Sequence, residues 1–79
     1  MFVERIYEWE MLKEFALKRR KDFEDGERNY KICTYLYVYA KGKDDNGCKS
    51  LMKKAGKAAI DIILASAPTA VKVIIEKFL

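Results

Sequence analysis

Apolar residues recur every three or four positions along most of this chain, which is the period of one face of an α-helix. In residues 2–24 neither glycine nor proline interrupts the pattern before Gly26, and strong helix formers dominate. The apolar positions form two stripes: a first of Phe2, Ile6, Trp9, Leu12, Ala16 and Phe23, and a second of Tyr7, Met11 and Phe15. We predict a helix over residues 2–24 whose first stripe faces a core. The second stripe is covered by another element or binds a partner.

The tyrosine-rich residues 30–41 support two interpretations. Alternation with a period of two and the tyrosine content favour a strand, which would pair in a hairpin with residues 48–52 or across a dimer. The helical interpretation has better capping signals at its ends, because Asp25 can serve as N-cap and Gly42 lies just past Lys41. A helix apolar on nearly all sides would be the central element of a bundle. We therefore predict a helix over residues 27–41 and keep the strand as the alternative.

The remaining residues predict two further helices. Residues 42–47 have the composition of a polar loop, and an apolar periodicity then runs over residues 48–66, with Gly56 as a point of close approach. Pro68 ends that segment and opens a helix over residues 68–79, for which Ser66 is a candidate N-cap. The expected fold is all-α, a small four-helix bundle-like domain that takes in residues 1–79. The alternative is an α+β fold with a strand at residues 30–41.

Composition is consistent with one small globular core. The chain has 79 residues, of which 51% are hydrophobic and 35% are charged, with a formal net charge of +4. This share of apolar residues is too high for a disordered chain. Basic residues occur in three blocks, residues 18–21, 28–43 and 46–57, separated by acidic stretches. Such a balance favours an anionic partner, either an acidic protein face or a nucleic acid.

The residues needed for most catalytic sites are missing from the sequence. There is no histidine, which excludes the usual neutral-pH general base and every His-containing zinc site. Neither a GxxxxGK[ST] nor a GxGxxG phosphate loop occurs. Cys33 and Cys48 lack the spacing of a zinc site, and we expect two free thiols, with a single disulfide as the alternative. We expect no catalytic residues, metal, cofactor or small-molecule substrate.

The two ends of the chain bear on its location. Charged Glu4, Arg5, Glu8 and Glu10 stand where a secretory signal needs an apolar stretch, which favours a cytoplasmic protein. Residues 57–79 are apolar, but Pro68 and several charged residues divide them into two amphipathic pieces. A membrane partner is therefore not expected. A membrane-active peptide is kept as the second alternative function.

These observations favour a small, basic, non-enzymatic regulator or inhibitor that binds another protein and can form a homodimer, of the kind that phage or mobile elements encode. The candidate partner-binding residues are Tyr7, Met11, Phe15, Lys18, Arg19, Arg20 and Lys21. The first alternative is a DNA-binding regulator that uses residues 18–21 together with a secondary basic cluster, residues 49–57. That cluster consists of Lys49, Lys53, Lys54 and Lys57.

Overall fold

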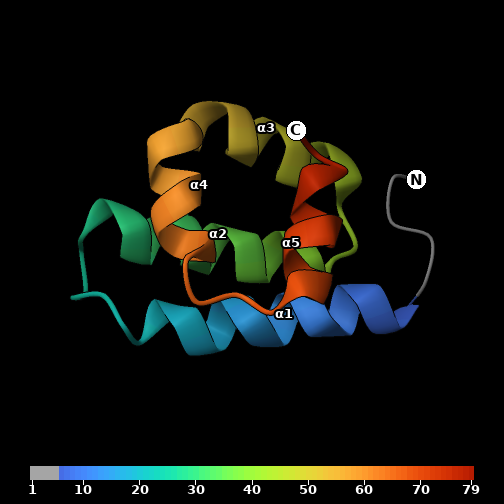
Figure 1. Ribbon diagram of the computed structural model, residues 1–79, viewed down its shortest axis with the longest axis horizontal. Helices are drawn as coiled ribbons and strands as arrows, with labels where there is room; N and C mark the ends of the chain where they lie inside the picture. Colours follow the sequence, from blue (N-terminus) through green and yellow to red (C-terminus); the bar gives the residue numbers. More distant parts are fainter. Residues whose placement is uncertain (1–5) are drawn as a thin grey trace.

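Helices account for the regular structure of residues 6–79. The computed structural model describes residues 6–79, and within them there are five helices (Figure 1). They are α1 (Ile6–Arg20), α2 (Arg28–Lys41), α3 (Asp45–Ala55), α4 (Lys57–Leu64) and α5 (Thr69–Glu76). The predicted all-α class is confirmed, although the prediction had four helices. Residues 1–5, where the first predicted helix begins, lie outside the described part of the chain.

The tyrosine-rich segment is helix α2, so the strand interpretation of residues 30–41 is wrong. Its buried residues, Ile32, Cys33, Leu36 and Ala40, follow the helical period. Helices α1, α3 and α4 all pack against α2, which makes it the central element that the helical interpretation required. Intrinsic strand propensity is a weak preference, and packing of α2 among three neighbours overrides it.

Helix α1 ends at Arg20, four residues earlier than predicted. Phe23 lies in the turn that follows and still packs against the core, so its place in the first apolar stripe reflects burial and not helix continuity. The Arg19 guanidinium carbon lies 4.7 Å from the centre of the Phe23 ring. A cation at this distance from an aromatic ring is attracted to it, which helps to hold the turn against the helix end.

Residues 48–66, predicted as one helix, belong to two helices, and the first of them begins three residues earlier than predicted. Helix α3 begins at Asp45 because Asp44 caps it, its Oδ1 accepting a hydrogen bond of 2.8 Å from the Gly47 backbone N–H. The helix then breaks at Gly56, whose φ of +84° and ψ of 158° are accessible essentially to glycine alone. The predicted close approach at Gly56 is wrong, since a Cβ there would meet nothing within 4 Å.

Helix α5 is shorter than the predicted range of residues 68–79. Its N-cap is Pro68, with φ at −61°, and not Ser66. Proline suits this position because its fixed φ matches a helix start and no partner is needed for a backbone N–H. The helix buries Val71, Ile74 and Ile75, and Phe78 is also buried just after the helix ends.

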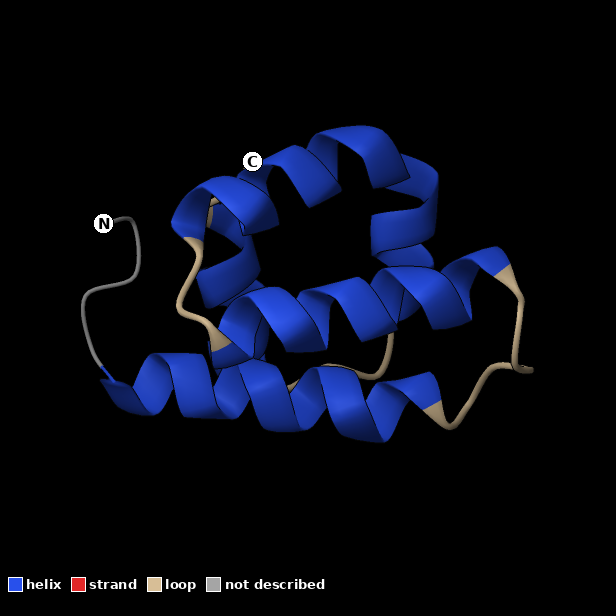
Figure 2. Cartoon of the chain, turned by 180° about the vertical axis from the view of Figure 1, so that it is seen from behind, coloured by secondary structure: helices blue, strands red, loops and turns tan. Residues whose placement is uncertain are grey.

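The five helices surround one core of buried side chains. Helices α1 and α2 make an antiparallel pair, α3 runs on the other side of α2, and α4 and α5 stand across them (Figures 1 and 2). The core residues are all apolar, and Trp9, Leu36 and Phe78 are among the largest that are fully buried. Within residues 6–79, no helix combines the length and the apolar character that crossing a membrane requires.

Candidate functional site

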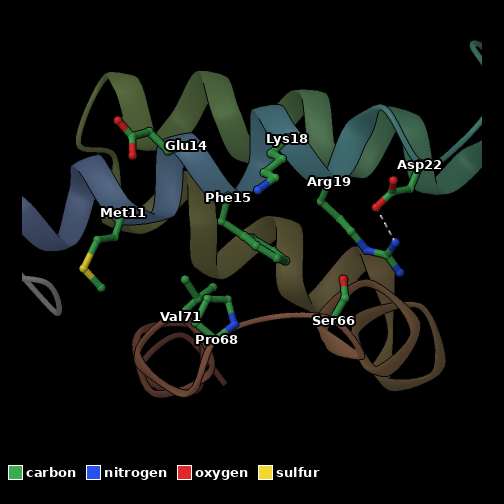
Figure 3. A pocket seen from close by; sticks show the side chains of 9 residues that line it. All are labelled: Met11, Glu14, Phe15, Lys18, Arg19, Asp22, Ser66, Pro68 and Val71. Atoms are coloured by element: carbon green, nitrogen blue, oxygen red, sulfur yellow. Dashed lines mark hydrogen bonds and ion pairs between the residues drawn. The ribbon is translucent and has the colours of Figure 1, made fainter.

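A cleft of about 500 Å³ lies between α1 and the segment that joins α4 to α5. We call it the α1–α5 cleft. Met11 and Phe15 project from α1 towards Pro68 and Val71, which form the opposite wall (Figure 3). The residues that line it are Met11, Glu14, Phe15, Lys18, Arg19, Asp22, Ser66, Pro68 and Val71. The cleft thus combines an apolar floor with a rim that carries charges of both signs.

Four of the seven predicted partner-binding residues line this cleft: Met11, Phe15, Lys18 and Arg19. Met11 and Phe15 are half-buried, packing against the core while still facing the opening. Tyr7 lies one helical turn before Met11 and is 54% exposed, so the second apolar stripe continues beyond the cleft. Lys21 is exposed and does not line the cleft.

The two arginines of the basic block at residues 18–21 are engaged with the fold. Arg19 donates from Nε to the carbonyl oxygen of Ile63 at 3.0 Å and from Nη2 to that of Ile62 at 2.8 Å. These carbonyls belong to the last turn of α4, where a helix leaves acceptors without an intrahelical donor. Arg19 also forms an ion pair with Asp22 at 2.8 Å. The guanidinium of Arg20 lies 5.3 Å from the centre of the Tyr30 ring.

The secondary basic cluster is distributed over two helices. Lys49, Lys53 and Lys54 belong to α3, whereas the break at Gly56 places Lys57 on α4. All four lysines are exposed. The first predicted basic cluster meets the helix that carries Lys57, because Arg19 bonds to carbonyls in the last turn of α4.

A second hollow, of about 450 Å³, lies between α2 and α3 and is named here the α2–α3 groove. Its lining comprises Arg28, Lys31, Ile32, Tyr35, Tyr39, Ser50, Leu51, Lys54 and Ala55. Lys54 belongs to the predicted secondary basic cluster, whereas Arg28, Lys31, Tyr35 and Tyr39 were not among the predicted binding residues. A signal was present, because residues 31, 35 and 39 are spaced by four and so share one helix face. The α3 wall that completes the groove could not be inferred from that spacing.

Both cysteines are free and buried, which confirms the expectation of free thiols. Burial raises the pKa of Cys33 to about 11 and that of Cys48 to about 12, and the nearby carboxylates of Asp44 and Asp45 add to the rise at Cys48. The thiolate is the reactive form, so these side chains are poor nucleophiles at neutral pH. In the described residues, 6–79, no group of three His, Cys, Asp or Glu side chains is placed to hold a metal ion.

No protein-family model, curated protein or solved structure matches this chain. The chemistry of the two hollows therefore carries the functional argument. The α1–α5 cleft offers an apolar floor with a balanced rim, which suits the apolar side chain of a partner. The α2–α3 groove carries three cations and no carboxylate in its lining, which suits an anion.

Proposed function

We propose that this protein is a small non-enzymatic regulator or inhibitor that binds an amphipathic helical segment of another protein in the α1–α5 cleft. One observation carries the proposal: Met11 and Phe15, singled out by their four-residue spacing, line a cleft whose far wall is formed by Pro68 and Val71. An unpartnered stripe and a concave apolar site thus coincide. A helix laid along α1 would insert its own apolar side chains at matching intervals of three or four residues.

The residues of the floor suit such a partner. Methionine is flexible and adapts to different side chains, and Phe15 offers an aromatic surface for edge or stacking contacts. Tyr7 extends the apolar surface by one turn beyond Met11. Half-buried residues that already pack against the core are held in place, which lowers the entropic cost of binding.

The rim sets the polarity of the partner. Arg19 is paired with Asp22, so Glu14 and Lys18 are the rim charges that a partner meets. An acidic side chain next to the apolar anchors would pair with Lys18. Rim charges of this kind affect the association rate and orientation more than the affinity.

A binding role accords with the low reactivity of the residues that could act as nucleophiles. Both thiols are buried, and burial raises the pKa of each. The proposal sets the protein in the cytoplasm, where free thiols such as these stay reduced. A second copy of the chain is an alternative occupant of the cleft, as expected for a homodimer.

Met11→Glu tests the proposal. Helical peptides would be selected from a random library on the wild-type protein alone, and their affinities for the wild type and for Met11→Glu would then be compared. We expect selected peptides to carry an aromatic or aliphatic anchor and to shift the methyl NMR signals of Met11 and Val71. Binding should weaken at least about tenfold in Met11→Glu, because a charged side chain on the apolar floor loses roughly 1.4 kcal/mol or more of binding free energy.

Val73→Glu is the matched control, since Val73 is 50% exposed and does not line the cleft. This variant should bind the selected peptides with wild-type affinity. Sedimentation equilibrium of the protein alone would show whether a second copy fills the cleft. Peptides that bind the wild type and Met11→Glu equally would refute the proposal. So would peptides that shift NMR signals only of residues away from the cleft.

A further inference from the structure

We propose that the α2–α3 groove is a binding site for single-stranded nucleic acid. It lies on other helices than the α1–α5 cleft, so the two proposals stand or fall separately. The juxtaposition that carries it is of three cationic side chains, Arg28, Lys31 and Lys54, with two tyrosines, Tyr35 and Tyr39, in one hollow.

The charged side chains that line the α2–α3 groove are all positive. The sequence alternates basic and acidic blocks, but the groove collects only basic residues: its lining includes no aspartate or glutamate. Lys31 and Lys54 are exposed and come from opposite walls, α2 and α3. Cations that converge on a hollow from two sides produce a positive potential there, which attracts a chain of phosphates.

Arg28 is fixed at one end of the groove. Its Nη2 donates to the carbonyl oxygens of Lys54 at 3.2 Å and of Ala55 at 2.8 Å, at the end of α3. These bonds use one of the three guanidinium nitrogens and lock the orientation of the side chain. A guanidinium held in this way is prepared to contact a phosphate with less loss of side-chain entropy than a mobile lysine.

The groove also contains two stacked aromatic rings. Tyr35 and Tyr39 stack with a centroid distance of 6.4 Å and an interplanar angle of 22°. Tyr35 is 54% exposed, so its ring is accessible to a base from solvent. Single-stranded nucleic acids are bound by grooves in which cations track the backbone while bases stack on aromatic faces. Lys31, Tyr35 and Tyr39 follow one another at four-residue steps along α2, which places charge and rings on one line.

The rings also distinguish between classes of polyanion. A duplex keeps its bases stacked inside, so its phosphates could reach the lysines while its bases could not reach Tyr35. An acidic peptide would pair with the cations but would gain little from the stacked tyrosines. A single strand is the polyanion that uses both features of the groove.

Fluorescence anisotropy with a short labelled oligothymidylate provides the test. We expect binding at low salt that weakens as salt is added, with a slope in log K against log salt of about −2 for three phosphate contacts on a single strand. An abasic oligomer of the same length and an acidic peptide of the same charge should each bind at least about fivefold more weakly, because they lack bases to stack.

Four substitutions at three positions test whether the binding takes place in the groove. Tyr35→Ala should weaken oligothymidylate binding at least about fivefold, whereas Tyr35→Phe keeps the ring and should bind like the wild type. Lys31→Ala should weaken binding and reduce the magnitude of the salt slope by about 0.7. Lys72→Ala removes an equal charge from an exposed position on α5, outside the groove, and should leave binding unchanged.

The proposal is overturned by absence of binding at low salt, by equal binding of the abasic oligomer, duplex or acidic peptide, or by equal effects of Lys31→Ala and Lys72→Ala. Circular dichroism would check that each variant is folded. We expect no loss of fold, because Lys31, Tyr35 and Lys72 are all exposed. Met11→Glu should retain oligothymidylate binding, since Met11 does not line the groove. That variant separates this site from the protein-binding cleft.

Discussion

Cys33 and Cys48 act in this fold as small apolar side chains. Both have no exposed surface, and they come from adjacent helices, α2 and α3. The thiols ionise near pH 9 when solvated, whereas burial raises the pKa to about 11 for Cys33 and about 12 for Cys48. Folding therefore depends on pH in an alkaline range where carboxylates no longer titrate.

The sign of this dependence follows from proton linkage. Below pH 9 the thiols are protonated in both states, and their contribution to stability is fully present. Between pH 9 and pH 11 the unfolded state loses these protons while the folded state keeps them, so the free energy of unfolding falls. The decline is at most about 1.4 kcal/mol per pH unit for each thiol.

We expect a Cys33→Ala/Cys48→Ala variant to be less stable than the wild type at neutral pH but to lose less stability between pH 9 and pH 11. Urea unfolding followed by the fluorescence of Trp9 measures both quantities. The two proteins differ only at these two positions, so the comparison isolates the thiols. Parallel decline of the two proteins over this range would show that the thiols are not the cause.

At the scale of elements, two arginines connect helices through bonds to residues that are distant in sequence. Arg19, in the last turn of α1, bonds to carbonyls at the end of α4, and Arg28, at the start of α2, bonds to carbonyls at the end of α3. In both cases a cation meets the negative end of a helix dipole. The α1–α2 pair thereby holds the ends of the two helices that meet at Gly56.

Arg19→Ala should lower the free energy of unfolding by about 1–3 kcal/mol, because the bonds to two carbonyl oxygens and the ion pair with Asp22 are lost, although the Ile62 carbonyl still accepts from the Ala65 N–H. Arg19→Lys should recover only part of this loss, since one ammonium cannot reproduce the fork of the guanidinium. The measurement is urea unfolding at neutral pH. Lys21→Ala, from the same basic block but exposed, should stay within about 0.5 kcal/mol of the wild type. Equal effects of the two alanine variants would disprove the capping role.

The periodicity of the sequence predicted helix for α1, α3, α4 and α5, whereas for α2 it favoured a strand and only the flanking residues favoured a helix. Not all of the boundaries could be predicted. Leu51, Ala59 and Ile63 fit one continuous helical pattern, and glycine within such a pattern is often tolerated. The break at Gly56 depends on packing of α4 against α2, which is a tertiary contact. The start of α3 was missed for a different reason: Asp44 was taken as part of a polar loop, whereas its side chain caps the helix.

At the scale of the whole molecule, α1 packs against α5 and the residues that follow it. The rings of Trp9 and Phe78 lie 6.2 Å apart, and Lys77 forms a 2.9 Å ion pair with Glu8. The indole Nε1 of Trp9 is buried with no hydrogen-bond partner among residues 6–79, so apolar packing must account for the burial of this side chain. The exposed ion pair adds little by comparison.

Phe78→Ala should therefore destabilise the protein by about 3–5 kcal/mol, which is close to the whole stability that a core of this size supplies. We expect this variant to be largely unfolded near room temperature, with the fluorescence of Trp9 shifted towards that of a solvated indole. Leu79→Ala is the neighbouring control, because Leu79 is 70% exposed and should change stability by less than about 0.5 kcal/mol. A cooperative, wild-type-like melt of Phe78→Ala would contradict this account of the core.

The candidate sites were predictable only on the side that a single helix provides. Met11 and Phe15 could be identified because a four-residue step is a local property of α1. The walls that face them, Pro68 and Val71, are brought there by the arrangement of α4 and α5. Arg19 was predicted to bind a partner because it belongs to the basic block at residues 18–21. Its actual acceptors, the Ile62 and Ile63 carbonyls, belong to the backbone and leave no trace in residue type.

The packing of Trp9 on Phe78 also sets the order of events during synthesis. A ribosome releases the first helix well before residue 78, so a nascent chain must wait for the side chain that covers its indole. Helices α1 and α2, adjacent in sequence and packed together, can pair in the meantime. Until residue 78 has left the ribosome, the face of α1 that α5 covers is open to a chaperone or to a neighbouring nascent chain.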